Sequence, residues 1–526
     1  MNEVGSTWRP FLRNLWTTAA LLASVLRPAQ EAVAQVRRSG NEIQINKSFV
    51  GAQFRPDVAI GPRGRCSVVW GGDFAEHPER GFGIWAQRFR RNGSRSGPEF
   101  VVTFAEAIDD RGEVEPAVAY AKDGSVAIAW EADRLDNGDD SSISFKVLDY
   151  EGNEKLASQR VSDTNGAANT SNAVARTPTG STMIVWQDGG FVLEIPPFVA
   201  KGRVYRPDGT PLSAPFALAE PGGNTHQPRV TVAGGNQFVV VWWGVRPDSM
   251  SGSDIFARRF DQNGVALGEE FRLNATTQGA QVRPDVAAAD DGGFLAVWES
   301  PEPDGSTGIY ARRFDAQNVP VGDEHHVNTF TTDSQIVPTV ENDGVGGFLV
   351  AWTSYSGLDT VGQDGDGPGV FGRRLNDDGS VDGLEFQINR FTKGAQGWVT
   401  WPIGLAARNG RAVAVWQSEQ QDGFDLGVFG QRLSVEPGAG PLCGDANAQD
   451  LELNILDAVQ VLRAAVGLRP CLGCLCDTDG SGSVGASDAS LVLRAVVGLP
   501  VSFQCPACAD GDESPAGIYG FGFPQK

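Results

Sequence analysis

Short apolar runs separated by glycine-containing turns recur along residues 41–434. One copy contains the runs PDVAA, FLAVW and IYARRF, followed by a fourth run of the type EFRLN or EFQIN. Runs of this length and apolar content predict strands. The turns between them, such as DDGG at 290–293 and QNG at 262–264, predict hairpins. The pattern therefore predicts four antiparallel strands in each copy.

The copies align on a tryptophan that recurs at steps of 54 to 64 residues, at positions 70, 130, 186, 242, 298, 352 and 416. A proline lies 14 residues before six of these tryptophans, and Asn172 takes its place in the third copy. Seven four-stranded units predict a mainly β fold, a seven-bladed β-propeller. A β-solenoid would use shorter coils, and a row of sandwiches would need longer units.

The two ends of the repeat region predict how the ring closes. The seventh copy stops at VFGQRLS (428–434), before a fourth strand, whereas NEIQIN (41–46) precedes the first copy and nearly duplicates LEFQIN (384–389). We expect Ile43 and Ile45 to pair into the last blade, because closure removes exposed sheet edges. The strand that begins at the proline is then the innermost.

The repeated tryptophan is interpreted as core between blades, with an aromatic binding ladder as the alternative. Phe238, Phe294 and Phe348 lie four residues ahead of it in three copies, and Cys66 takes this place in the first copy. Cys66 is therefore expected to be a small buried thiol. Paired arginines on the third strand (258–259, 312–313 and 373–374) are expected to place one member of each pair outward.

Charge and the N-terminus favour export. The formal net charge of −22 argues against nucleic-acid binding. Arg9 and Arg13 precede the apolar run 15–26, and AVA (32–34) offers a cleavage site, so residues 1–34 are predicted to be a signal peptide rather than a disordered leader. The run is too short for a membrane span, and no transmembrane anchor is expected. The predicted location is secreted, extracellular or at the cell surface.

Residues 435–442 form a predicted linker, and a cysteine-rich domain follows at 443–508. It contains six of the seven cysteines, at 443, 471, 474, 476, 505 and 508. Disulfides would stabilise a domain this small, and a zinc cluster is the alternative. The tail 509–526 is expected to be disordered.

This domain contains a predicted Ca²⁺ loop that leads into a helix. Asp477, Asp479, Ser481, Ser483 and Asp488 occupy loop positions 1, 3, 5, 7 and 12, with Gly482 at the sharp turn. An earlier copy is one residue too long and lacks the glycine. Its candidate calcium ligands are Asp445, Asn447, Gln449 and Asp457. Helical spacing of Val459, Leu462 and Val466, and of Leu491, Leu493 and Val496, predicts that the two halves pack together.

The 41–434 repeat resembles uncharacterised propeller-forming repeats of bacterial secreted proteins. The duplicated loop–helix pair resembles a type I dockerin. The second resemblance implies a small α-helical domain with two calcium loops, which in that family docks onto a cohesin. Positions 486–487 and 455–456 correspond to the recognition residues of that family.

No catalytic or cofactor-binding residue stands out. The four histidines have no metal-ligand spacing, and carboxylates are too abundant for an acid–base pair to be chosen. Acidic loops at 71–81, 131–142, 362–369 and 418–425 lie on the predicted loop face. The sequence thus favours a secreted calcium-binding scaffold, with a dockerin-like attachment to a cohesin-like or cell-surface protein and a carbohydrate as candidate ligand. The alternatives are a polysaccharide-acting, glycoside hydrolase-type enzyme and a structural cell-surface component. Two carboxylates that face each other across the loop face with raised pKa values would favour the enzyme, and a shallow face without such a pair would favour binding.

Overall fold

The computed structural model describes residues 35–436 with short gaps, and part of the C-terminal region. The gaps are 48–50, 74–81, 105–111, 135–139, 163–168, 190–197, 247–251, 357–361, 398–401 and 424. In the C-terminal region the described residues are 458, 459, 461, 462, 465, 478, 484 and 486–496.

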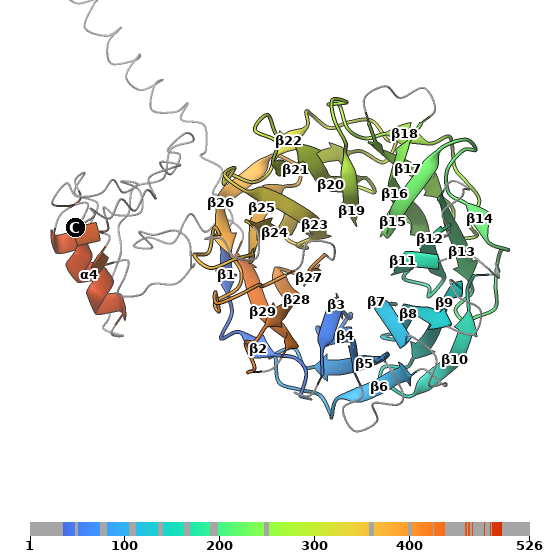
Figure 1. Cartoon of the computed structure of the whole chain (residues 1–526), viewed down its shortest axis with the longest axis horizontal. Coiled ribbons are helices and arrows are strands. Elements are labelled where there is room, and N and C mark those ends of the chain that lie inside the picture. The colour runs from blue at the N-terminus through green and yellow to red at the C-terminus, as the bar shows by residue number, and fades with distance from the viewer. Residues whose placement is uncertain are drawn as a thin grey trace, which may run out of the picture.

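Seven antiparallel sheets surround one axis as blades, which confirms the predicted propeller (Figure 1). Blade 1 consists of β3 (Gln53–Ile60), β4 (Cys66–Asp73), β5 (Phe82–Phe89) and β6 (Phe100–Phe104). Blade 2 consists of β7 (Gly112–Tyr120), β8 (Val126–Arg134), β9 (Asp140–Leu148) and β10 (Glu154–Arg160). Blade 3 consists of β11 (Asn169–Arg176), β12 (Thr182–Asp188), β13 (Val199–Tyr205) and β14 (Phe216–Ala217).

The remaining blades repeat this order, with the proline-bearing strand innermost in each, as predicted. Blade 4 consists of β15 (Asn224–Ala233), β16 (Gln237–Val245), β17 (Asp254–Phe260) and β18 (Phe271–Arg272), with the 3₁₀ turn η2 (Gly234–Asn236) after β15. Blade 5 consists of β19 (Val282–Ala288), β20 (Phe294–Pro301), β21 (Thr307–Phe314) and β22 (His325–His326). Blade 6 consists of β23 (Ser334–Asn342), β24 (Gly347–Tyr355), β25 (Gly369–Asn376) and β26 (Val381–Gln387).

Blade 7 joins the two ends of the propeller region. It consists of β27 (Gly404–Arg408), β28 (Arg411–Glu419) and β29 (Leu426–Glu436), with β1 (Gln35–Arg38) and β2 (Ile43–Gln44) both paired to β29. Ile43 lies opposite Gly430, and the Ile45 N–H donates to the Val428 carbonyl at 2.8 Å. The predicted closure by residues 41–46 is confirmed. The pairing of β1 was not predicted, because only Val36 of its residues QVRR is apolar.

The core lies between adjacent blades. All seven repeated tryptophans are at most 1% exposed, which confirms the core interpretation, and Cys66 is buried beside Val68 and Phe89. The second arginine of each predicted pair (Arg259, Arg313 and Arg374) is buried, and the first of each pair is more exposed. Alternation along the third strand therefore places one member of each pair inward, as predicted.

Two faces of the ring follow from this order. We call the face on which the inner strands begin the loop face. The opposite face, where hairpins connect the first to the second strand and the third to the fourth, is the turn face.

The predicted C-terminal helix is present as α4 (Ala486–Val496). Its buried residues are Asp488, Ala489 and Val492, whereas Leu493 is exposed. Ala458 and Val461 are likewise buried while Val459 and Leu462 are exposed. The buried face is therefore shifted from the predicted one, because apolar residues at helical spacing occupy two faces here. No helix among the described residues is long and apolar enough to span a bilayer.

Candidate functional site

Six of the inner strands contain the same bulge just before the repeated proline position. The residue preceding that position has a φ between 46° and 53°, in the left-handed region, in each of Arg55, Glu115, Ser171, Gln227, Arg283 and Val337. A non-glycine residue adopts this conformation only where the surrounding structure enforces it. In blade 7 the corresponding residue 401 is outside the described residues. Bulges re-aim neighbouring side chains, and here they do so near the loop face.

Side chains from the preceding blade hold these bulges in place. The N–H of Val337 donates to Oε1 of Glu299 at 2.6 Å, and the N–H of Gln227 donates to Oε1 of Gln187 at 3.2 Å. Across the closure, the N–H of Arg55 donates to Oε1 of Gln417 at 3.0 Å. All three acceptors directly follow a repeated tryptophan. A Glu or Gln at this position therefore connects blade 3 to blade 4, blade 5 to blade 6 and blade 7 to blade 1.

Directly after the proline, charged side chains from different blades approach the axis. Asp57, Arg229 and Asp285 occupy this position in blades 1, 4 and 5, and Glu341 lies two residues further along its inner strand in blade 6. Oδ2 of Asp57 accepts the N–H of Val118 at 2.8 Å. Among the described residues, the carboxyl group of Glu341 makes no hydrogen bond. These four charged residues form the axial cluster.

Burial raises the pKa values of the three acids, and like charge adds to the shift in Asp57 and Glu341. Burial raises the pKa of Asp57 to about 6, and Asp285 adds to this shift while Arg229 opposes it. Burial also raises the pKa of Asp285, against the charge of Arg229 and hydrogen bonds from Val340 and Thr339. The pKa of Glu341 lies well above its usual range because of burial and the charges of Asp285 and Asp57. Glu341 has no cation that opposes its shift, so it retains its proton most readily.

Aromatic and charged side chains lie beside the bulges toward the loop face. The rings of His226 and Trp243 are stacked with centroids 4.0 Å apart, and the indole N–H of Trp243 donates to Oε1 of Gln227 at 2.9 Å. Ion pairs join Arg55 to Glu115 and Arg283 to Glu299, each at 3.1 Å. Trp243 is half-buried and presents a flat apolar surface next to polar groups, an arrangement suited to a sugar ring.

The axial cluster has the groups needed for general acid–base chemistry. One carboxyl group that stays protonated and others that ionise more easily can divide the roles of acid and base. The positive charge of Arg229 can neutralise the negative charge of one carboxylate. Among the described residues, no group of three His, Cys, Asp or Glu could hold a metal ion.

The predicted calcium ligands are described at one residue only. Asp488 is buried in the first turn of α4, and its Oδ1 accepts the hydroxyl of Thr478 at 3.2 Å, so these two residues of the predicted loop are in contact. The other ligands lie outside the described residues and stay predictions: Asp445, Asn447, Gln449, Asp457, Asp477, Asp479, Ser481 and Ser483. The six C-terminal cysteines and the leader 1–34 also lie outside them.

Sequence reasoning missed the axial cluster. Its members are spread over residues 57–341, among 65 Asp and Glu residues, so no local motif marks them. One signal was available: Asp57 and Asp285 both follow the repeated proline, where blades 2 and 3 have Ala117 and Ala173. A charge at an inward-facing repeat position is unusual enough to be noticed.

Comparisons with known proteins return solved structures only. No protein-family model and no curated protein matches the sequence. A Dyadobacter fermentans protein of unknown function aligns at 10% identity and a TM-score of 0.41, over 76% of this chain and 99% of that one. An α-L-arabinanase of Penicillium chrysogenum with arabinobiose aligns at 13% identity and a TM-score of 0.42, over 61% and 92%. A Fusarium graminearum α-L-arabinofuranosidase of family GH93 aligns at 12% identity and a TM-score of 0.41, over 61% and 92%.

Likenesses at this level describe architecture and do not assign an activity. Those described by an activity include an α-L-arabinanase and a family-43 glycoside hydrolase. The first choice made from the sequence, a non-enzymatic scaffold, is corrected, because the axial cluster brings together carboxyl groups whose raised pKa values suit acid–base chemistry.

Proposed function

We propose that the chain is a polysaccharide-acting enzyme of the glycoside hydrolase type, with its reacting groups in the axial cluster. The observation that carries this proposal is the approach of Asp57, Asp285 and Glu341, from blades 1, 5 and 6. Burial raises the pKa values of all three, and neighbouring acids add to the shift in Asp57 and Glu341. Such values let carboxyl groups exchange protons near neutral pH.

Each acid has a role that its surroundings favour. Glu341 keeps its proton and donates it to the glycosidic oxygen that leaves, as the general acid. Asp285 lies near Arg229 and is the carboxylate that acts as base or nucleophile on the sugar carbon. Asp57 holds the inner strand of blade 2 through Val118 and positions the cluster. Trp243, half-buried and backed by His226, offers a stacking surface for a neighbouring sugar.

The test compares wild type with Glu341→Gln, which keeps the shape of the side chain and removes the transferable proton. Release of reducing ends from arabinans, xylans, mannans and glucans is measured across pH 4 to 9. We expect kcat to fall roughly a hundred- to ten-thousandfold in the variant, because this is the usual contribution of a general acid. The alkaline limb of the pH profile, where Glu341 loses its proton, should also disappear.

Glu154→Gln is the matched control, because Glu154 lies exposed on the outer strand of blade 2. It should retain wild-type rates, and both variants should keep the wild-type melting temperature within a few degrees. A wild-type chain that cleaves none of these polysaccharides, or a Glu341→Gln variant that cleaves them at full rate, would contradict the proposal.

A calcium-binding C-terminal loop is part of this proposal. Asp477, Asp479, Ser481, Ser483 and Asp488 would supply oxygen ligands, and the contact of Asp488 with Thr478 agrees with a closed loop. Calcium would order this region and take no part in bond cleavage. Calcium titration of the full chain and of Asp477→Asn, with Asp510→Asn in the tail as control, tests it: equal affinity in all three would count against the loop.

A further inference from the structure

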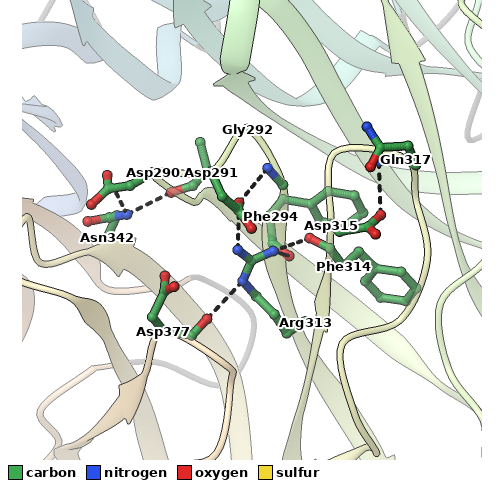
Figure 2. Close-up of polar contacts among 12 residues, drawn as sticks. Asp290, Asp291, Gly292, Phe294, Arg313, Phe314, Asp315, Gln317, Asn342 and Asp377 are labelled. Carbon is green, nitrogen blue, oxygen red and sulfur yellow. Dashed lines mark hydrogen bonds and ion pairs between the residues drawn. The ribbon is translucent and has the colours of Figure 1, made fainter.

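Arginines connect successive blades at the turn face. Arg313 of blade 5 donates from Nε to the carbonyl of Asp377, in a turn of blade 6, at 2.9 Å (Figure 2). Its guanidinium lies over the ring of Phe348, 6.0 Å from the centroid. Arg259 of blade 4 repeats this arrangement on blade 5, donating to the Asp315 carbonyl at 3.1 Å and lying 5.4 Å from the centroid of Phe294. At these junctions the arginine covers a phenylalanine.

The junction between blades 7 and 1 keeps the arginine and lacks the phenylalanine. Arg432 occupies the position of Arg259 and Arg313, and its Nη1 donates to the Asn92 carbonyl in the turn of blade 1 at 2.8 Å. Cys66 stands where blades 5 and 6 have Phe294 and Phe348. A cavity of about 630 Å³ lies at this junction, and Cys66 is among its lining residues. Replacing a large ring by a small thiol leaves such a space.

The walls of this cavity are apolar and its rim is cationic. Ile60, Val68 and Val413 are among the apolar residues that line it. Six arginines line it as well: Arg63, Arg90, Arg91, Arg408, Arg411 and Arg432. No Asp or Glu is among the lining residues, and within the described part of the chain none of the six arginines has an ion-pair partner. The corresponding turns of blades 5 and 6 have acids instead, among them Asp291, Asp315 and Asp343.

Six neighbouring guanidinium groups without a carboxylate are unusual in a protein with a net charge of −22. Because the six carry like charges, an anion that binds between them is favoured. Arginine binds carboxylate, sulfate and phosphate groups through paired hydrogen bonds. The apolar walls, in turn, suit a hydrocarbon or aromatic body.

We propose that this junction is a binding site for an amphiphilic organic anion, whose apolar body enters the cavity at Cys66 and whose anionic head meets the arginine rim. The cavity volume lies in the range of sites for small molecules. The site is on the turn face, whereas the bulges and aromatic pair of the candidate active site lie toward the loop face. This inference is independent of the proposed function.

The first experiment uses the full chain and 8-anilinonaphthalene-1-sulfonate, an aromatic sulfonate whose fluorescence rises in apolar surroundings. We expect saturable binding of one probe molecule. Decanoate and decyl phosphate should displace it, and the stronger competitor identifies the preferred head group. Decyltrimethylammonium, with the same tail and a positive head, should displace it at least tenfold more weakly. Equal displacement by the cation, displacement by sodium sulfate alone, or no probe binding would overturn the proposal.

Two substitutions then locate the site. Cys66→Phe restores the ring that the other junctions have and should weaken probe binding at least tenfold while raising the melting temperature. Arg90→Glu should weaken it similarly through charge. Arg206→Glu is the matched control, because Arg206 occupies the same turn position in blade 3 as Arg90 does in blade 1. If Cys66→Phe does not fold, Cys66→Leu replaces it. Probe binding that survives both the Cys66 and the Arg90 substitutions would place the site elsewhere and overturn the proposal.

Discussion

His226 shows how a single half-buried residue couples this fold to pH. Its ring lies between Phe198 and Trp243, with centroid distances of 4.7 and 4.0 Å. Burial lowers the pKa of His226 to about 4, because the imidazolium ion loses hydration there. The unfolded chain therefore takes up this proton at a higher pH than the folded chain does.

From this difference we predict that the contribution of His226 to stability is complete above pH 6.5 and is lost as the pH falls toward 4. The measurement is the free energy of unfolding in urea at pH 7, 5.5 and 4.5, for wild type and His226→Gln. The stability difference between the two should grow as the pH rises. A constant difference across this range would show that His226 titrates equally in both states.

At the scale of elements, four blades each have an asparagine just after the outer strand, and its side chain accepts a hydrogen bond from the third strand. Oδ1 of Asn274, Asn328 and Asn389 accepts an N–H at the start of the third strand of blades 4, 5 and 6, at 2.7 to 2.9 Å. Asn46 does the same for Val428 in blade 7 at 2.9 Å. The asparagine of NEIQIN therefore behaves as the end of a fourth strand, although 382 residues separate it from its partner.

The arginine connections between blades carry the second prediction. Arg313 is 2% exposed and has hydrogen bonds to Asp377 and, at 2.7 Å, to Oδ1 of Asp291 (Figure 2). Arg313→Ala removes these hydrogen bonds and the contact with Phe348, so we expect a loss of about 2–4 kcal/mol in unfolding free energy. Arg312→Ala, at the outward-facing neighbour, should cost less than about 1 kcal/mol. Chemical denaturation measures the unfolding free energy of both variants. Equal losses for Arg313→Ala and Arg312→Ala would show that the connection made by Arg313 adds no stability of its own.

The strand pattern of the elements could be predicted from the sequence, and their finer features could not. Tryptophan spacing and hairpin turns predicted four strands per blade, and blades 1 to 6 have four, while β1 adds a fifth to blade 7. The left-handed residues before the prolines were not predictable, since a residue before proline ordinarily avoids that region. In three of them, Val337, Gln227 and Arg55, the backbone N–H donates to a Glu or Gln of the neighbouring blade, and this contact depends on the tertiary structure.

For the whole molecule, closure brings together residues that are far apart in sequence. Both β1 and β2 pair with β29, and Ile45 is 1% exposed in the core between blades 7 and 1. A chain that begins at Lys47 exposes the edge of β29 and should aggregate or melt well below wild type. A chain that begins at Gln35, the product of the predicted cleavage, should melt as wild type does. Thermal unfolding with light scattering distinguishes these outcomes, and equal melting of the two chains would mean that closure is dispensable.

The sequence alone determined the architecture, because a repeated core position leaves the same mark in every copy. The tryptophans, the prolines and the displaced fourth strand fixed the number of blades and the manner of their closure. Tertiary structure alone decided where chemistry can occur. Asp57, Asp285 and Glu341 acquire raised pKa values only when the ring brings blades 1, 5 and 6 around one axis. Likewise, the cavity at Cys66 forms only in the closed ring, because its lining includes both Cys66 of blade 1 and Arg432 of blade 7, which is 366 positions later. Proximity across a closed ring depends on all seven blades, and no single segment encodes it.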